Sequence, residues 1–213
     1  MNALIVGGAP VTGADAFYRS LIMAADTVIA ADRGGLLCVS AGRSPDLWVG
    51  DFDSVPPEVP EQAEREGITV LRYPPAKDAS DLDLALDATR RLTPASVTFT
   101  AAFSDRLDHT LAGIGTLLRA VDLHAWAAEP SFSMYPLDAK SRPVITLAET
   151  PGTTVSLFAL DPGTVASIDG VRFPLQAEEL PPLSSRGLSN VATSRQQRVA
   201  VVAGRLLVVV IAT

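Results

Sequence analysis

The chain has 213 residues, of which 47% are hydrophobic and 19% charged, and its formal net charge is −7. This length allows one large domain or two small ones. The composition excludes a disordered chain, and the acidic charge excludes a general nucleic-acid binder, which needs a basic surface to contact phosphates.

The cysteine count and the apolar runs bear on where the protein works. A single cysteine, Cys38, excludes a disulfide scaffold and fits a reducing compartment. The first residues lack the basic segment of a signal peptide. The longest apolar run, 206–212, is far shorter than the ~20 residues of a membrane helix. We therefore expect a soluble, cytoplasmic protein.

The charge is distributed unevenly along the chain. Residues 1–128 hold 17 acidic and 10 basic residues, a net charge of −7, whereas residues 129–213 hold seven of each. This difference indicates two parts that are built differently.

The first part alternates short apolar runs with segments of helical character. The runs are continuous rather than alternating, as in strands buried on both faces: 3–8, 27–32, 47–51, 68–73 and 96–102. The helical segments are 14–25, 34–42, 56–67, 80–92 and 108–122. This order predicts βαβ units and a mostly parallel sheet.

Two of these helices carry strong local signals. Apolar residues recur at steps of three and four from Leu107 through Leu111 to Val121, as in an amphipathic helix. Ser80, followed three residues later by Asp83, resembles a capping box with Asp in place of the usual Glu.

The second part has a different period. Its apolar runs predict strands at 144–147, 153–160, 165–168, 171–175 and 199–212, and turn signals such as Asp169-Gly170 separate them. Since no convincing amphipathic helix occurs there, we predict a small antiparallel sandwich or barrel. We expect an α/β domain at 1–128, a linker at 129–143, which contains three prolines, and an all-β domain at 144–213.

The first candidate site follows the third predicted strand and reads Gly50-Asp51-Phe52-Asp53-Ser54. Two carboxylates spaced i, i+2 point the same way on an extended backbone, and ligands of open α/β sheets bind at the carboxyl ends of the strands. Like charges so close favour a cation between them, and oxygen ligands suit Mg²⁺. The alternative is a solvated turn, which Asp and Ser also favour.

The second candidate site is the segment 77–86, where a loop leads into a helix. Acidic residues in the first turn of a helix are favoured by its dipole alone, which is the simpler explanation. That explanation does not cover Asp78, which precedes the cap and would add to the carboxylates of Asp51 and Asp53. Asp87 is predicted to form a surface ion pair with Arg90 or Arg91.

The third candidate site is Asp105-Arg106-Leu107-Asp108-His109, which opens the last predicted helix of the first part. A helix start beside an arginine is suited to bind an anion. The alternative makes Asp108 an N-cap and His109 a surface residue. His124 and Cys38 read as structural.

A fourth segment, 184–190, lies in the second part. Its serines and Asn190 offer hydrogen-bonding groups to a polar ligand, and a plain loop is the alternative.

Five short segments are distributed over nearly the whole chain. In order, they are Ala31-Asp32-Arg33-Gly34-Gly35, Gly50-Asp51-Phe52-Asp53-Ser54, Lys77-Asp78-Ala79-Ser80-Asp81-Leu82-Asp83-Leu84-Ala85-Leu86, Arg106-Leu107-Asp108-His109 and Leu188-Ser189-Asn190. Together they resemble the thiamine pyrophosphokinase family. The chain departs from the family pattern at three places. Ser80 replaces a threonine, Ser104 and Asp105 replace two glycines before Arg106, and Arg33 separates Asp32 from the glycine that follows it in the family.

The resemblance implies an ATP-binding α/β domain and a β-sandwich that helps to bind thiamine. It implies homodimers, whose active sites combine the α/β domain of one subunit with the β domain of the other. The reaction it implies is Mg²⁺-dependent transfer of a pyrophosphoryl group from ATP to the hydroxyl of thiamine, which gives thiamine diphosphate and AMP. Catalysis would then rest mostly on positioning and on cations that neutralise phosphate charge.

The resemblance also implies a role for each site residue. The metal ligands are Asp51, Asp53, Asp78 and Asp81. The catalytic residues are Asp51, Asp53, Asp81 and Arg106. The nucleotide side is Asp32, Gly34, Arg106, Asp108 and His109, and the thiamine side is Ser189 and Asn190.

Two other functions stay open on the sequence. Asp51 and Asp53 imitate the nucleophilic pair of haloacid-dehalogenase-like phosphatases, but that reading needs a downstream lysine, and Lys140 lies in the predicted linker. The altered residues before Arg106 also allow a non-catalytic sensor of nucleotide or thiamine.

Overall fold

The structure is a computed structural model that describes residues 1–13, 15–104 and 106–212. Ala14, where the first helix is predicted to begin, and Asp105, at the start of the third candidate site, lie outside the described residues. The chain divides into two compact units, Met1–Leu123 and His124–Thr213. No helix among the described residues has the length and apolar character that a membrane crossing requires.

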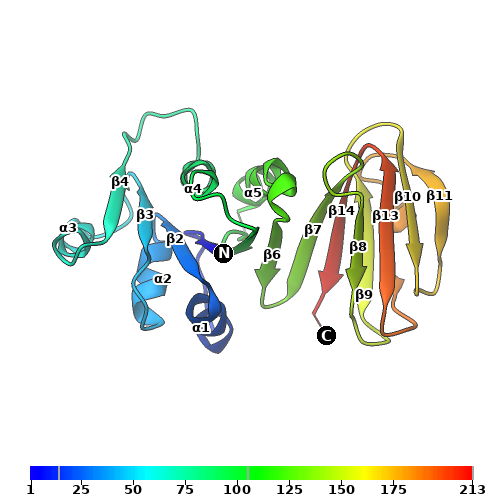
Figure 1. Cartoon of the computed structure of the whole chain (residues 1–213), viewed down its shortest axis with the longest axis horizontal. Coiled ribbons are helices and arrows are strands. Elements are labelled where there is room, and N and C mark those ends of the chain that lie inside the picture. Colours follow the sequence, from blue (N-terminus) through cyan, green and yellow to red (C-terminus); the bar gives the residue numbers. More distant parts are fainter. Residues whose placement is uncertain (14, 105, 213) are drawn as a thin grey trace. The chain divides into compact units, whose positions relative to one another are not determined.

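The first unit alternates strands and helices as predicted (Figure 1). Its strands are β1 (Asn2–Val6), β2 (Thr27–Ala31), β3 (Leu47–Gly50), β4 (Thr69–Arg72) and β5 (Ser96–Thr100). Its helices are α1 (Asp15–Ala24), α2 (Gly34–Ser40), α3 (Glu58–Arg65), α4 (Asp81–Arg90) and α5 (Leu107–Arg119), followed by a short 3-10 helix, η1 (Val121–Leu123). The predicted ends differ from these by at most three residues.

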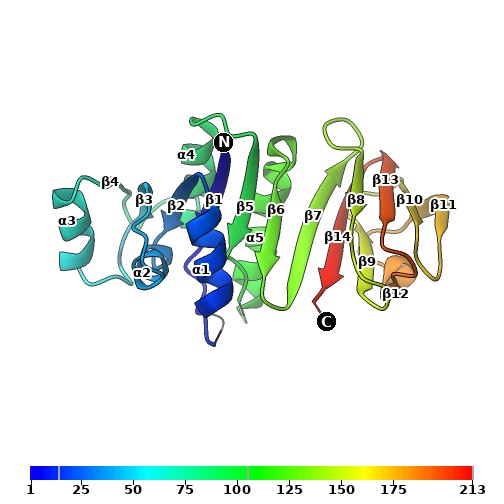
Figure 2. The ribbon, with the colours of Figure 1, turned by 60° about the horizontal axis from the view of Figure 1, so that its bottom comes forward.

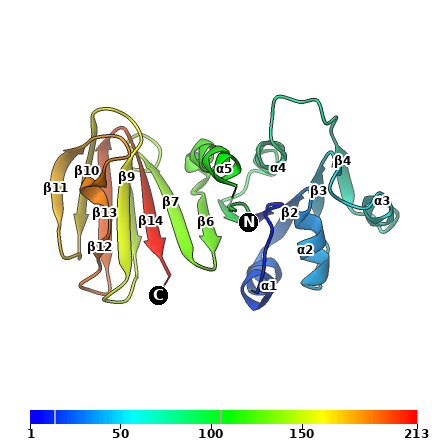
Figure 3. The ribbon, with the colours of Figure 1, turned by 180° about the vertical axis from the view of Figure 1, so that it is seen from behind.

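The strands of the first unit form a parallel sheet in the order β5-β1-β2-β3-β4, which Figure 2 shows. Helices α1 and α2 lie on one face of the sheet, and α4 and α5 lie on the other (Figures 1 and 3). Because both faces are covered, residues such as Ile5, Ile29 and Phe99 are fully buried, which explains the continuous apolar runs. The chain reverses its direction of travel across the sheet at β1, where ligands of such folds commonly bind.

Helix α5 does not bury the stripe that the sequence emphasises. Leu107 and Leu111 are 68% and 59% exposed, whereas Gly113, Thr116 and Leu117 are buried. Gly113 permits this orientation, because a Cβ there would lie 3.3 Å from the ring of Phe103. The buried face of α5 therefore combines two small residues with Leu117, and the predicted apolar stripe is only partly buried.

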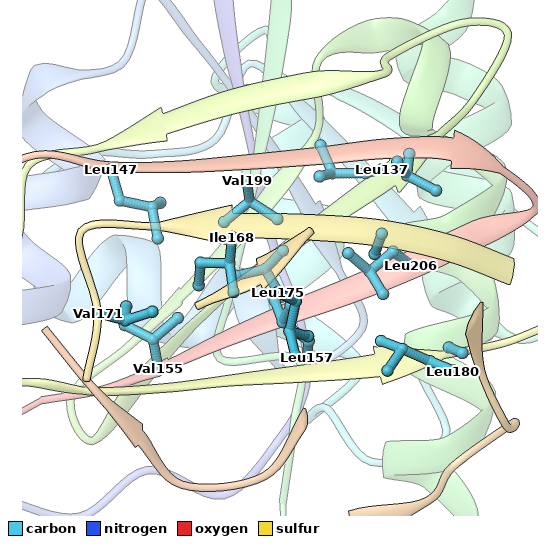
Figure 4. Close-up of a cluster of buried hydrophobic side chains, with 14 of the residues drawn as sticks. Leu137, Leu147, Val155, Leu157, Ile168, Val171, Leu175, Leu180, Val199 and Leu206 are labelled. Atoms are coloured by element: carbon cyan, nitrogen blue, oxygen red, sulfur yellow. The ribbon is translucent and has the colours of Figure 1, made fainter. Parts of the chain in front are cut away.

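The second unit is a sandwich of two antiparallel sheets, ordered β12-β9-β14-β7-β6 and β11-β10-β13-β8. Leu157 and Leu206 from one sheet meet Ile168 and Val199 from the other in its buried core (Figure 4). Its strands are β6 (Trp126–Glu129), β7 (Phe132–Asp138), β8 (Val144–Leu147), β9 (Thr154–Ala159), β10 (Thr164–Asp169), β11 (Leu175–Leu180), β12 (Asn190–Val191), β13 (Gln197–Ala203) and β14 (Arg205–Ile211), with a 3-10 helix, η2 (Ser185–Gly187).

The interpretation of 129–143 as a linker is wrong. This segment contains β7, and the chain divides after Leu123 instead of after residue 128. The prolines misled the prediction. Pro130 lies in the turn before β7, and Pro136 lies beyond the residues of β7 that pair with β6, so the N–H that Pro136 lacks is not needed on that side.

Two strand predictions in the second unit are also wrong. The strand expected at 171–175 begins only at Leu175, and Val171 forms an isolated bridge with Ala192. The run 199–212 belongs to two strands, β13 and β14, which lie in different sheets. Gly204 turns the chain between them with φ of 73°, a conformation that suits glycine.

Candidate active site

A cavity of about 790 Å³ opens at the carboxyl ends of the parallel strands of the first unit. Its described lining comes from the segments that follow each of the five strands. These are residues 7–10 after β1, 31–33 at the end of β2, 51, 53 and 54 after β3, 75, 77 and 79–82 after β4, and 102, 104, 106, 108, 109, 112 and 113 after β5. The second and third candidate sites, far apart in sequence, thus meet the first one here.

The backbone turns sharply at three of these strand ends. Asp32, Phe52 and Ala101 have φ of 45°, 60° and 48°, in the left-handed region that non-glycine residues rarely adopt. Strained backbone of this kind persists where surrounding contacts hold it and is frequent at functional sites.

The backbone of the first candidate site is therefore not extended, contrary to the expectation for Asp51 and Asp53. Phe52 is 7% exposed and its ring packs edge-on against Trp48, with 5.6 Å between ring centroids. Burial of Phe52 leaves the two flanking carboxylates at the cavity. The two carboxylates therefore line the same cavity, as the spacing predicts, although the backbone between them is not extended.

Three carboxylates form a cluster at this point. Oxygen atoms of Asp32, Asp51 and Asp53 all lie within 4.8 Å of one another. Ser54 Oγ donates a hydrogen bond to Asp32 Oδ2, and Asp32 Oδ1 is buried without a hydrogen-bond partner among the described residues. A buried carboxylate oxygen that lacks a partner is costly, so the cluster fits a divalent cation with oxygen ligands.

Lys77 stands between this cluster and α4. Its Nζ lies 2.7 Å from Asp51 Oδ2 and 3.2 Å from Asp81 Oδ1. The hydrogen bond from Lys77 lowers the pKa of Asp51, while burial raises the pKa of Asp81 despite the nearby ammonium. Burial lowers the pKa of Lys77, but its bonds to both carboxylates outweigh burial and leave that pKa above its ordinary value.

The predicted anion site at α5 is occupied by an internal ion pair. Arg106 Nη2 donates to Asp108 Oδ2 at 2.5 Å, and both side chains are exposed. This hydrogen bond lowers the pKa of Asp108 to about 2. Asp108 is not the N-cap, because Arg106 holds that position without a capping side chain. His109 lines the cavity from the first turn of α5.

Two of the site residues predicted in the first unit are not part of the described lining. Asp78 does not line the cavity, although its neighbours Lys77 and Ala79 do. Gly34 does not line it either, because Gly34 packs against the carbonyl oxygen of Val6, where a Cβ would clash. The structure thus gives Gly34 a steric reason to be glycine.

The predicted thiamine residues lie in the second unit. Ser189 is exposed and has φ of 55°. Asn190 is 8% exposed, and its side chain accepts from Phe173 N at 3.0 Å and donates to Phe173 O at 2.6 Å. Asn190 therefore holds the backbone of Phe173, whose ring is 63% exposed.

Several cavity residues were missed as site candidates from the sequence. Lys77 opens the second motif, and one signal was its rarity, because the chain has only one other lysine, Lys140. Ser54 was quoted in a motif without a role, and it bonds to Asp32. Arg33 was noted only as a departure from the family pattern, and it lines the cavity.

Fold and site together define the class. This is an α/β protein with a cavity at the strand ends that is lined by carboxylates and by cationic side chains. Residues 18–126, half of the chain, match the family model described as the catalytic domain of thiamin pyrophosphokinase. The chain belongs to the thiamin pyrophosphokinase family.

Relatives and solved structures agree with this assignment. The thiamine pyrophosphokinase of Bacillus subtilis (strain 168) is 32% identical over 93 residues, which span 44% of this chain and 44% of that protein. The crystal structure of a thiamine pyrophosphokinase from Bacillus subtilis has the same fold, with a TM-score of 0.84, 21% identity and full coverage of both chains. The thiamin pyrophosphokinase from Candida albicans superposes with a TM-score of 0.82 at 15% identity, covering 100% of this chain and 89% of that one.

Proposed function

We propose that this chain catalyses Mg²⁺-dependent transfer of a pyrophosphoryl group from ATP to the hydroxyl of thiamine, which yields thiamine diphosphate and AMP. The observation that carries the proposal is the cluster of Asp32, Asp51 and Asp53, inside a segment that matches the thiamin pyrophosphokinase catalytic domain. Asp32 Oδ1, buried without a hydrogen bond, supports a cation at this cluster.

The proposed metal ligands are Asp32, Asp51 and Asp53, with Asp81 joined to them through Lys77. Asp78 stays a predicted ligand. A bound Mg²⁺ would neutralise the charge of the phosphate oxygens. Lys77 already balances part of the carboxylate charge and holds Asp51 in place, which keeps the cluster together.

The proposed roles of the remaining cavity residues follow from their positions. Burial raises the pKa of Asp81, so this carboxylate holds a proton more readily than usual, which suits acceptance of the proton from the thiamine hydroxyl. Arg106, Asp108 and His109 would contact the nucleotide, and Gly34 would position the start of α2 beside it.

The proposed assembly is a cytoplasmic homodimer in which the second unit of one subunit completes the cavity of its partner. Ser189 would contact thiamine directly, and Asn190 would act by holding Phe173. The exposed apolar side chains of Phe173 and Leu188, beside these residues, support a covered surface in the assembled enzyme.

A direct assay tests the proposed reaction. The purified chain is incubated with ATP, Mg²⁺ and thiamine, and AMP and thiamine diphosphate are quantified by mass spectrometry. Formation of both products in equal amounts is expected. Release of inorganic phosphate, with a covalent aspartyl-phosphate on Asp51, would instead establish a phosphatase. Binding of nucleotide without any turnover would establish a sensor.

A further inference from the structure

The cavity is lined by three cationic side chains among the described residues, and they differ in what they already hold. Lys77 is bonded to Asp51 and Asp81, and Arg106 is bonded to Asp108. Arg33 lines the same cavity and is exposed, and its side chain has no hydrogen-bond or ion-pair partner among the described residues. Its five N–H donors are therefore available to a ligand.

The backbone beneath Arg33 is held firmly, although its side chain is free. Asp32 N donates to Val49 O at 2.8 Å, and Asp32 O accepts from Trp48 Nε1 at 2.7 Å. Arg33 O accepts from Leu36 N at 3.0 Å, within the first turn that leads into α2. These bonds and the left-handed backbone at Asp32 thus fix the point at which the side chain of Arg33 leaves the backbone.

Arg33 also lies against the loop after β1. A Cβ on Gly8 would be 3.5 Å from Arg33 N and 3.7 Å from Arg33 Cβ, so Gly8 and Arg33 are neighbours at the cavity. Arg33 thus offers a free cation to the same cavity that the carboxylates of Asp51 and Asp53 line. A polyphosphate would be repelled by those carboxylates wherever no cation intervenes.

We infer that Arg33 binds phosphate oxygens of the nucleoside triphosphate, a role that rests on the proposed function for the identity of the ligand. Its planar guanidinium group can give two parallel hydrogen bonds to one phosphate, which also orients the chain of phosphates. Lys77 and Arg106, in contrast, already share their charge and some of their donors with carboxylates. Arg33 is therefore the residue that attracts and orients the phosphate chain before the metal-binding carboxylates act.

The test replaces Arg33 with methionine, which keeps a long side chain and removes the charge. It also replaces Arg33 with lysine, which keeps the charge and removes the planar group that forms two parallel hydrogen bonds. Arg65→Met is the matched control, because Arg65 is exposed on α3 and lies outside the cavity lining. Affinities for Mg²⁺–ATP and for adenosine are measured by isothermal titration calorimetry, and KM for ATP, KM for thiamine and kcat by product formation. Thermal unfolding of each variant checks that it folds.

Arg33→Met should bind ATP about tenfold or more weakly, in line with the loss of charged hydrogen bonds, and should bind adenosine as the wild type does. KM for ATP should rise while KM for thiamine stays unchanged, and Arg33→Lys should fall between. Wild-type ATP affinity in Arg33→Met, or an equal loss for adenosine, would overturn the inference. If the wild type binds ATP through Arg33 but forms no thiamine diphosphate, the proposed function fails and the inference stands.

Discussion

At the scale of single residues, this site is defined by which polar groups have partners and which do not. Asp51 is held by Lys77, and Asp108 by Arg106. Asp32 Oδ1 and the guanidinium group of Arg33 have no hydrogen-bond partner among the described residues. The carboxylate oxygen suits a cation and the guanidinium group suits an anion. These two groups without partners therefore match the metal and the phosphates of a metal–nucleotide complex.

Asp53 allows the clearest test of the metal role, because its side chain is exposed and contributes little to the packing. Asp53→Asn removes a charge without changing shape, so turnover should fall on the order of 10²-fold, while the midpoint of urea unfolding stays nearly constant. Glu61→Asn, on exposed α3, is the control for loss of an acidic charge outside the cavity. Wild-type rates for Asp53→Asn at saturating Mg²⁺ would remove the metal role.

Cys38 is expected to be chemically inert in the folded chain. It is 0% exposed, and burial raises the pKa of its thiol to about 12. A thiol reagent at pH 8 should therefore modify the denatured protein and leave the native protein unmodified. Rapid modification of the native chain would show that α2 opens locally.

The same thiol should make stability depend on pH. The folded pKa lies above the unfolded value of 9.0, so the contribution of Cys38 is full below pH 9 and is lost as pH rises toward about 12. Urea unfolding of the wild type should lose up to about 1.4 kcal/mol per pH unit in this range relative to Cys38→Ala. A difference that does not change with pH would contradict this assignment.

At the scale of elements, polar contacts of Asp83 tie α4 to α5. Asp83 completes the capping box with Ser80, and its Oδ1 accepts from Thr116 Oγ1 at 2.7 Å and from Arg119 Nη1 at 2.8 Å. Both helices begin at the cavity, with Asp81 and His109 in their first turns. The Asp83 contact therefore fixes the distance between two walls of the site.

Thr116→Val should test this tie. Thr116 is 2% exposed, and the loss of its hydrogen bond should lower the free energy of unfolding by about 1–2 kcal/mol. Thr89→Val is the matched control, since the hydroxyl of Thr89 is equally buried but bonds only to Ala85 O within α4. Urea titrations of both variants give the comparison. Equal destabilisation by the two substitutions would show that the contact between helices adds nothing.

How far the sequence predicts these elements depends on the kind of signal. The parallel strands are visible because burial on both faces leaves continuous apolar runs such as 27–32. The strand pair β13 and β14 was read as one strand, because apolar residues continue through Gly204 and only tertiary packing shows that the chain changes sheet there. Strand β7 was missed because Pro136 argues against a strand, although the pairing of β7 with β6 ends before the proline.

The site shows the same limit. Motifs predicted which loops carry Asp51, Asp53 and Asp81, since carboxylates at strand ends are readable in one dimension. They did not predict that Asp32 joins the cluster, or that Lys77 bridges Asp51 and Asp81. Those relations follow from the order of the strands in space, which no local pattern determines.

At the scale of the whole molecule, the uneven charge follows the division into units. All of the net −7 lies in residues 1–123, which contain the cavity, and residues 124–213 carry equal numbers of acidic and basic residues. A polyphosphate approaching an acidic unit needs cations to counter its field. The proposed metal and Arg33 would supply positive charge at the cavity of this unit.

The proposed sharing of active sites between subunits predicts complementation. Asp53→Asn inactivates a site through the first unit, and Ser189→Arg would inactivate it through the exposed loop of the second. In a random mixture half of the dimers are mixed, and each has one intact site of two, so activity should recover to about a quarter of the wild-type rate. A mixture of Asp53→Asn with Asp51→Asn is the control, because both changes affect the first unit and no intact site can form. Subunit exchange is verified with differently tagged chains. Exchange without recovery in the first mixture would show that each subunit completes its own site.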